Sequence, residues 1–143
     1  MLIKRIRLLS DAAAWLGMFR DNTIKKEIVR LIQEEQLTKK GVDGNDQVIG
    51  YYSAFTSLVN KKKKFNEPYD LNDTGKFYES MYVYATLDAI YTVAFREFED
   101  GQNIFDKYGE DIISLTDESF EIVKDMVREI GYIAYVRKVL QLD

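Results

Sequence analysis

Tyr-Asp-Leu-Asn-Asp-Thr-Gly-Lys-Phe-Tyr-Glu-Ser-Met-Tyr-Val, residues 69–83, joins a polar turn directly to an aromatic segment. Asp and Thr side chains in the turn can accept hydrogen bonds from nearby backbone N–H groups, and its Gly can adopt a positive φ. The enrichment in aromatic and β-branched residues after the turn favours a strand over residues 77–86. That strand would place Phe77, Glu79, Met81 and Val83 on one face and Tyr78, Ser80, Tyr82 and Tyr84 on the other.

A second strand is expected to return beside this one. Thr86-Leu87-Asp88 predicts a turn, and residues 89–96 alternate in a similar way. A two-stranded hairpin is seldom stable alone. We therefore expect it to pack on helices, to join the extended residues near 42–49, or to pair with another subunit.

Three segments have the apolar spacing of helices. Residues 2–19 begin with basic residues and suit a membrane surface or, because of Asp11, packing on protein. Residues 23–38 carry one apolar stripe of Ile24, Ile28, Leu31 and Ile32, with Gly41 as the stop. Residues 117–140 start after Thr116, a good N-cap, and place Phe120, Val123, Val127, Ile130 and Ala134 on one face.

The remaining segments are short. Residues 41–50 predict a tight turn between extended arms, because a calcium loop counted from Asp43 would need Glu where Ala54 stands. Residues 51–60 fit a short helix or an irregular segment. We expect an acidic loop over 97–101, a short helix over 103–108 and a brief strand over 112–115.

These elements together predict an α+β fold. It would have N-terminal helices, a small antiparallel β-sheet built on the Tyr-rich hairpin, and a long C-terminal helix. The 143 residues are enough for one domain with a real core. We expect a single domain over 1–143, with residues 1–22 as an N-terminal helical arm and 23–143 as the α+β body.

The composition excludes much catalytic chemistry. The chain has no Cys and no His, which removes disulfides, thiol nucleophiles, His-based triads and the usual zinc sites. Asp73-Thr74-Gly75 also opens the active-site loop of retroviral-type aspartic proteases, but Asn72 and Lys76 flank it here. A carboxylate hydrolase would need two acids to converge, such as Asp70 with Asp73 or Glu110 with Asp111, and closeness in the sequence does not show convergence. We expect no enzyme and no cofactor.

The charge is unevenly distributed along the chain. Residues 1–66 hold 13 Lys and Arg against 7 Asp and Glu, and residues 67–143 hold 7 against 17, so balances of +6 and −10 sum to −4. This polarity could orient head-to-tail contacts between identical subunits, or mix over one surface. Lys61, Lys62, Lys63 and Lys64 form either a solvated loop or a non-specific phosphate contact. The acidic second half argues against nucleic acid as a partner, and no stretch is apolar enough to span a membrane.

A series of short motifs runs along residues 24–140. In chain order they are Gln36-Leu37, Lys40-Gly41, Asp43-Gly44, Gly50, Tyr52-Ser53, Asp73-Thr74-Gly75, Tyr78, Ser80, Phe105 and Gly109-Glu110-Asp111. This order resembles that of neck and tail-completion (head–tail connector) proteins of tailed bacteriophages. Tyr78 departs from the better-known families, which more often carry an Arg-containing segment before the Ser.

The resemblance implies a non-enzymatic virion structural protein, assembled in the bacterial cytoplasm. It would form a homo-oligomeric ring at the portal, neck and tail junction, with other neck, portal or tail proteins as partners. The implied turn and assembly motif is Asp73, Thr74, Gly75, Tyr78 and Ser80, and the candidate interface is Tyr82, Tyr84 and Tyr91. The alternative is a small intracellular protein-binding module, or a phage-encoded adaptor or inhibitor.

Overall fold

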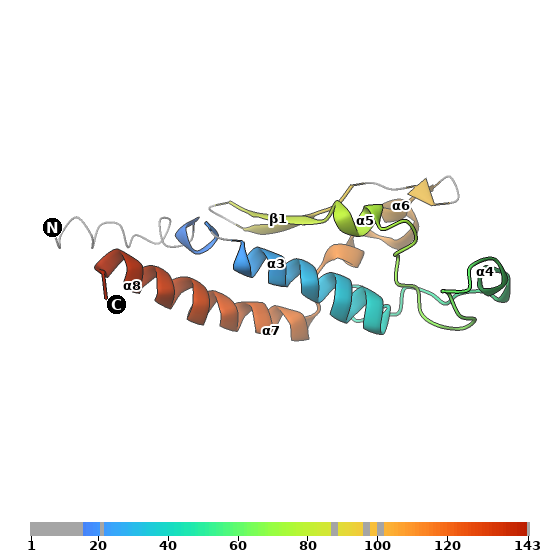
Figure 1. Ribbon diagram of the computed structural model, residues 1–143, viewed down its shortest axis with the longest axis horizontal. Coiled ribbons are helices and arrows are strands. Elements are labelled where there is room, and N and C mark those ends of the chain that lie inside the picture. The colour runs from blue at the N-terminus through green and yellow to red at the C-terminus, as the bar shows by residue number, and fades with distance from the viewer. Residues whose placement is uncertain (1–15, 21, 87–88, 96–97, 100–101, 143) are drawn as a thin grey trace.

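The computed structural model describes residues 16–20, 22–86, 89–95, 98–99 and 102–142. Two long helical segments run antiparallel, and a hairpin lies along the first of them (Figure 1). The first long segment is α3 (Thr23–Arg30) with its π-helical continuation η1 (Leu31–Lys40). The second is α7 (Asp117–Met126), continued by the π-helical η3 (Val127–Ile133) and by α8 (Ala134–Leu140). The short helices between them are α4 (Ala54–Val59), α5 (Lys76–Glu79), α6 (Ile104–Tyr108) and the 3-10 helix η2 (Glu110–Ile113). The strands are β1 (Tyr82–Ala85), β2 (Ile90–Val93), β3 (Phe98–Glu99) and β4 (Gln102–Asn103). The predicted α+β class is confirmed.

Both long helices lie where the sequence predicts them. The first, α3 with η1, ends as Gly41 takes a left-handed φ of 63°, and the N–H groups of Gly41 and Val42 bond back to Leu37 and Gln36. The second, α7 through α8, starts at Thr116, whose hydroxyl accepts a hydrogen bond from the N–H of Ser119 at 3.2 Å. Local stop and start signals therefore set these ends.

The core lies around α3 and η1. The predicted stripe is confirmed, because Ile24, Ile28, Leu31 and Ile32 are all buried. Gly131 in η3 lets α3 approach the C-terminal helix closely, since a Cβ there would lie 3.1 Å from the Ile24 side chain. The predicted face of the C-terminal helix is only partly buried: Val123 is in the core, whereas Phe120 and Ile130 are exposed.

The hairpin packs on a helix, which was one of the three expected ways to stabilise it. Strands β1 and β2 are antiparallel, with Val83 opposite Thr92 and Tyr84 opposite Tyr91. Val83 is buried against the core, and its face of the hairpin turns toward α3. The turn residues 87–88 lie outside the described residues.

The prediction that a strand begins at residue 77 was wrong. After Gly75 the chain makes one helical turn, α5, in which the N–H of Glu79 bonds to the carbonyl of Gly75 at 2.9 Å. The strand starts only at Tyr82. Phe77 and Met81 are both buried, and a spacing of four puts two side chains on one side of a helical turn as well as of a strand. The alternation alone could not separate the two.

The prediction of a strand over 112–115 was also wrong. Residues 110–113 form η2, which buries Ile112 completely. A short apolar run does not distinguish a strand from a helical turn. The predicted helix near 103–108 is confirmed as α6, and part of the expected acidic loop instead pairs as the small hairpin of β3 and β4.

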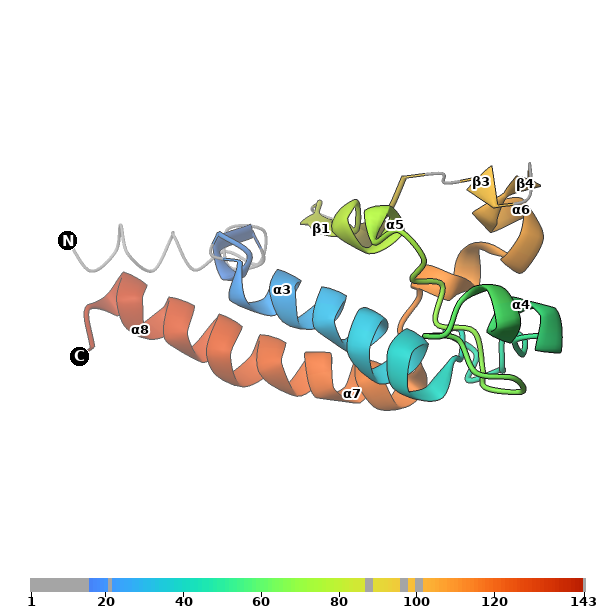
Figure 2. The same cartoon turned by 45° about the vertical axis from the view of Figure 1, so that its right-hand side comes forward.

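Residues 51–68 leave the body and return as one projecting unit, which we call the lobe. Its base is an antiparallel bridge between Tyr51 and Pro68, and its tip carries α4, capped by the Ser53 side chain. The tight turn predicted before it is confirmed by the bridge between Val42 and Val48. Figure 2 shows α4 at one end of the molecule, far from α8.

Most of the predicted N-terminal helix, residues 2–15, lies outside the described residues. Residues 16–18 are helical, and Met18 and Phe19 are buried in the core. The described part of this arm therefore packs on the body. Among the helices described, none is long and apolar enough to cross a membrane.

Candidate interaction surfaces

The Asp73-Thr74-Gly75 turn has the backbone geometry expected of it. Gly75 has φ 85° and ψ −15°, in the left-handed region, and the hydroxyl of Thr74 accepts a hydrogen bond from the N–H of Lys76 at 3.4 Å. The side chains of Asp73 and Thr74 are exposed. The turn therefore starts α5, and its carboxylate lies on the surface.

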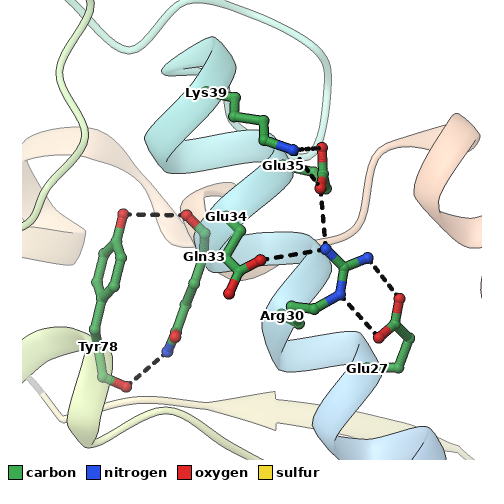
Figure 3. Close-up of polar contacts among 7 residues, drawn as sticks. All are labelled: Glu27, Arg30, Gln33, Glu34, Glu35, Lys39 and Tyr78. Atoms are coloured by element: carbon green, nitrogen blue, oxygen red, sulfur yellow. Dashed lines mark hydrogen bonds and ion pairs between the residues drawn. The ribbon is translucent and has the colours of Figure 1, made fainter.

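Tyr78 ties α5 to η1 and to the segment after the lobe. The amide of Gln33 donates to the backbone carbonyl of Tyr78 at 2.7 Å, and the Tyr78 hydroxyl donates to the carbonyl of Asp70 (Figure 3 draws the contacts with Gln33). Thr38 lies 3.2 Å from the same hydroxyl. Burial raises the pKa of Tyr78 to about 12, so it stays a neutral donor at physiological pH.

Ser80 joins α5 to the residues that follow β2. Its hydroxyl donates to the carbonyl of Phe77 at 2.7 Å and accepts from the N–H of Phe95 at 2.9 Å. Both of its hydrogen-bonding roles are thus filled within the chain. Tyr78 and Ser80 act here as links between elements.

A row of ion pairs covers one side of α3 and η1 (Figure 3). Arg30 bonds Glu27 at 2.6 Å and Glu35 at 2.9 Å, and Lys39 bonds Glu35 at 2.7 Å. The hydrogen bond from Arg30 lowers the pKa of Glu27, and those from Lys39 and then Arg30 lower the pKa of Glu35. These charges neutralise one another on the helix surface.

The run of four lysines does not act as one basic patch. Lys63 has a side chain only 11% exposed, and its ammonium lies 2.6 Å from Asp70, 2.7 Å from the carbonyl of Asn72 and over the ring of Tyr52. Lys61, Lys62 and Lys64 are exposed, and Lys64 lies 3.7 Å from Glu67. Lys63 therefore holds the lobe to the segment that follows it.

Asp70 is the centre of this contact. Besides Lys63, its carboxylate accepts from the Tyr52 hydroxyl at 2.7 Å and from the N–H of Asn72 at 2.9 Å. Burial alone would raise the pKa of Asp70, but the hydrogen bonds from Lys63, Tyr52 and Asn72 lower it below its ordinary value. Burial and the bond to Asp70 raise the pKa of Tyr52. Since Asp70 is already ion-paired, a converging acid pair with Asp73 gains no support.

The hairpin brings all three predicted interface residues to one face. Tyr82, Tyr84 and Tyr91 are 50%, 40% and 45% exposed. The rings of Tyr84 and Tyr91 stack across the strands with centroids 5.1 Å apart, and Tyr82 lies 6.3 Å from Tyr84. We call this surface the tyrosine face. Large amphipathic rings of this kind are enriched at protein interfaces.

Sequence reasoning missed two features of the structure. Gln36, 1% exposed, donates to the carbonyl of Ser114 at 2.8 Å and accepts from the N–H of Thr116 at 3.0 Å. Its position beside the buried Leu37, at the end of the apolar stripe, was the available signal. The lobe also exposes large apolar side chains, and here the run Ala54-Phe55 with Leu58-Val59 was visible in the sequence.

Comparisons with protein-family models, with curated proteins and with solved structures find no match to this chain.

Proposed function

We propose that this chain is a non-enzymatic structural protein of a tailed-bacteriophage virion. It serves as one subunit of a homo-oligomeric ring where the portal, neck and tail meet. Other neck, portal or tail proteins are its partners, and assembly takes place in the bacterial cytoplasm. The order of motifs around Asp73-Thr74-Gly75 and Ser80 points to this class.

The observation that carries the proposal is the tyrosine face. Three rings are aligned and held in contact, yet each remains about half exposed. Tyr presents a large apolar area, and its hydroxyl tolerates water before assembly. A row of this kind suits a surface that is wet in the free subunit and buried in the assembled particle.

The number of exposed apolar surfaces favours an assembly subunit over a small binding module. A monomeric adaptor or inhibitor needs one such patch. Here the tyrosine face, the lobe and the C-terminal helix each expose large apolar residues. Those of the C-terminal helix are Phe120, which borders β2 and η2, and Ile122, Ile130, Tyr132 and Ile133.

Complementation of a deletion tests the proposal. A phage that lacks this coding sequence should produce heads and tails that fail to join, visible by negative-stain electron microscopy. The chain supplied from a plasmid should restore plaques. The double variant Tyr84→Ser with Tyr91→Ser should not restore them, although it loses only about 1 kcal/mol of stability from the cross-strand pair.

The variant Asp73→Asn tests whether the chain is an enzyme that uses the Asp73 carboxylate. An exposed carboxylate in a turn contributes little to folding, so this variant should complement normally. Loss of plaques with Asp73→Asn, in a chain that folds and assembles like the wild type, would favour catalysis. Normal joining of heads and tails in the deletion phage would contradict the proposal.

A further inference from the structure

We propose that copies of this chain join head to tail, with the lobe of one copy seated in an apolar hollow beside β2 and α7 of the next. The inference rests on the proposed function and deepens it, because it assigns the two surfaces that close the ring. The partner on each side is a second copy of this chain.

The lobe exposes large apolar side chains to solvent, as a surface that binds another protein does before binding. Phe55, Leu58, Val59 and Phe65 are 74%, 81%, 72% and 66% exposed, and α4 buries none of its residues. A helix normally forms because an apolar face packs on something. Exposed apolar clusters of this kind mark interaction sites.

The lobe is held in place before any partner arrives. Lys63 bonds Asp70, and Tyr52 packs edge-on against Tyr69 with centroids 4.8 Å apart. Tyr69 in turn lies 6.0 Å from Tyr108 of α6. Rigid presentation of a contact lowers the entropy lost on binding. The lobe therefore presents its apolar tip in a fixed orientation.

The complementary surface is an open hollow of about 410 Å³ between α3, β2, η2 and α7. A space of this size accepts one or two large apolar side chains. Its walls are mostly apolar, and Phe120 on its border is 54% exposed. The hollow adjoins the tyrosine face, because Tyr91 lines it too. The aliphatic and Phe lining consists of Ile28, Ile90, Ile113, Leu115, Phe120 and Val123.

The two surfaces carry opposite charge. The lobe, residues 51–68, has four Lys and one Glu. Because Asp70 neutralises Lys63, the exposed Lys61, Lys62 and Lys64 with Glu67 leave a balance of +2. Residues 110–121, which supply half of the residues that line the hollow, have five Asp and Glu and no Lys or Arg. Lys40 pairs with Glu118 and Lys124 with Glu121, which leaves a balance of −3. Glu110 itself lines the hollow. Opposite potentials orient encounter and fix which surface meets which.

The positions of the two surfaces make the contact heterologous. The lobe lies at the end of the molecule beyond η1, whereas the hairpin lies along α3 (Figures 1 and 2). Each copy therefore offers one lobe and one hollow, and the pairing repeats from copy to copy. Such contacts close into rings when the rotation per subunit allows it.

Cysteine cross-linking tests the pairing directly, because the wild-type chain has no Cys. Val59→Cys marks the lobe and Thr92→Cys marks the hollow, and both changes nearly conserve size. A mixture of the two purified single variants, treated with a short bismaleimide, should give cross-linked dimer. Proximity should raise its yield about tenfold over a mixture of Val59→Cys with Lys138→Cys, which lies at the far end on α8.

The single and double variants separate the possible geometries. Neither single variant alone should cross-link, and the double variant should give a ladder of trimers and larger species. Efficient cross-linking of Val59→Cys with itself would show a lobe-to-lobe dimer and overturn the inference. Equal yields with Thr92→Cys and with Lys138→Cys, in concentrated protein and in purified particles, would also overturn it.

The outcome is separable from that of the proposed function. If the chain gives specific cross-links but is absent from virus particles, the pairing of lobe and hollow is supported and the virion role is contradicted. If the chain is present in particles but Val59→Cys and Thr92→Cys do not cross-link, the virion role is supported and this pairing is contradicted.

Discussion

At the scale of single residues, the contact between Lys63 and Asp70 contributes most to holding the lobe. Both side chains are largely removed from water, at 11% and 25% exposed. Removing one charge of such a pair destabilises the folded chain, because the remaining charge is poorly hydrated and has no partner. Surface pairs such as Lys64 with Glu67 lack this property.

Asp70→Asn should therefore destabilise the chain by about 1–3 kcal/mol. The variant keeps an oxygen for Tyr52 and for the N–H of Asn72 but removes the charge opposite Lys63. Urea denaturation followed by tyrosine fluorescence measures the change. Glu67→Gln, which breaks the exposed pair, is the control and should change stability by less than about 0.5 kcal/mol. Equal effects of the two variants would contradict this role of Asp70.

The same contact predicts a pH dependence. The pKa of Asp70 is lowered in the folded chain from an ordinary value of 3.8. Its contribution is therefore complete above the unfolded value and is lost as the pH falls through the lower folded value. The stability difference between wild type and Asp70→Asn should stay constant above about pH 5 and shrink below about pH 4. A difference that grows toward acid would contradict the assignment.

Gly75 affects stability through its backbone conformation. Its φ of 85° is costly for a side chain branched at Cβ, although the space around it is open, since the nearest atom to an added Cβ is 3.8 Å away. Gly75→Val should lower the free energy of unfolding by about 2 kcal/mol. Gly75→Asn, which tolerates the left-handed region, should lose less than half as much. Unchanged thermal stability in the Val variant would count against the turn.

At the scale of elements, the best-predicted parts are those whose ends have local signals. Gly41 stops the first long helix and Thr116 starts the last, and both act through their own backbone or side chain. The start of β1 and the 3-10 turn of η2 depend on burial of Phe77 and Ile112 by distant elements. Spacing within four or five residues does not contain that information.

The candidate surfaces follow the same division. Alternation predicted that Tyr82 and Tyr84 share a face of the first strand, but it did not say which face of the second strand lies beside them. The register, in which Tyr84 lies opposite Tyr91, brings Tyr91 to the same face. The role of Lys63 could not be read from a run of four lysines, since its partner is fixed by the path of the lobe. The apolar hollow is formed by four elements, α3, β2, η2 and α7, and has no local signature.

The side chain of Gln36 joins η1 to a segment 78 to 80 residues later in the chain. It connects η1 to the backbone on both sides of Leu115, before α7. Gln36→Met keeps the shape but leaves a carbonyl and an N–H unpaired, so it should cost about 2–4 kcal/mol in urea denaturation. Gln47→Met, at an exposed position, is the control. A loss below about 0.5 kcal/mol for Gln36→Met would show that water replaces the amide fully.

At the scale of the whole molecule, ion pairs partly neutralise the charge asymmetry of the sequence, because Lys40 bonds Glu118 and Lys63 bonds Asp70 across its two halves. The exposed Lys61, Lys62 and Lys64 still leave the lobe basic, and Glu110 lines the hollow. Self-association of the purified chain should therefore weaken as salt rises, because the screening length falls from about 10 Å at 0.1 M to about 3 Å at 1 M. Sedimentation velocity over that range measures it. The variant Lys61→Gln with Lys62→Gln should associate more weakly and with less salt dependence.

The most direct test of the virion role is quantitative mass spectrometry of gradient-purified virus particles from the culture that produces this chain. We expect the chain in particles at a stoichiometric level, comparable to that of the portal protein. Its absence from clean particles would contradict the structural role and would leave a binding module as the function to pursue.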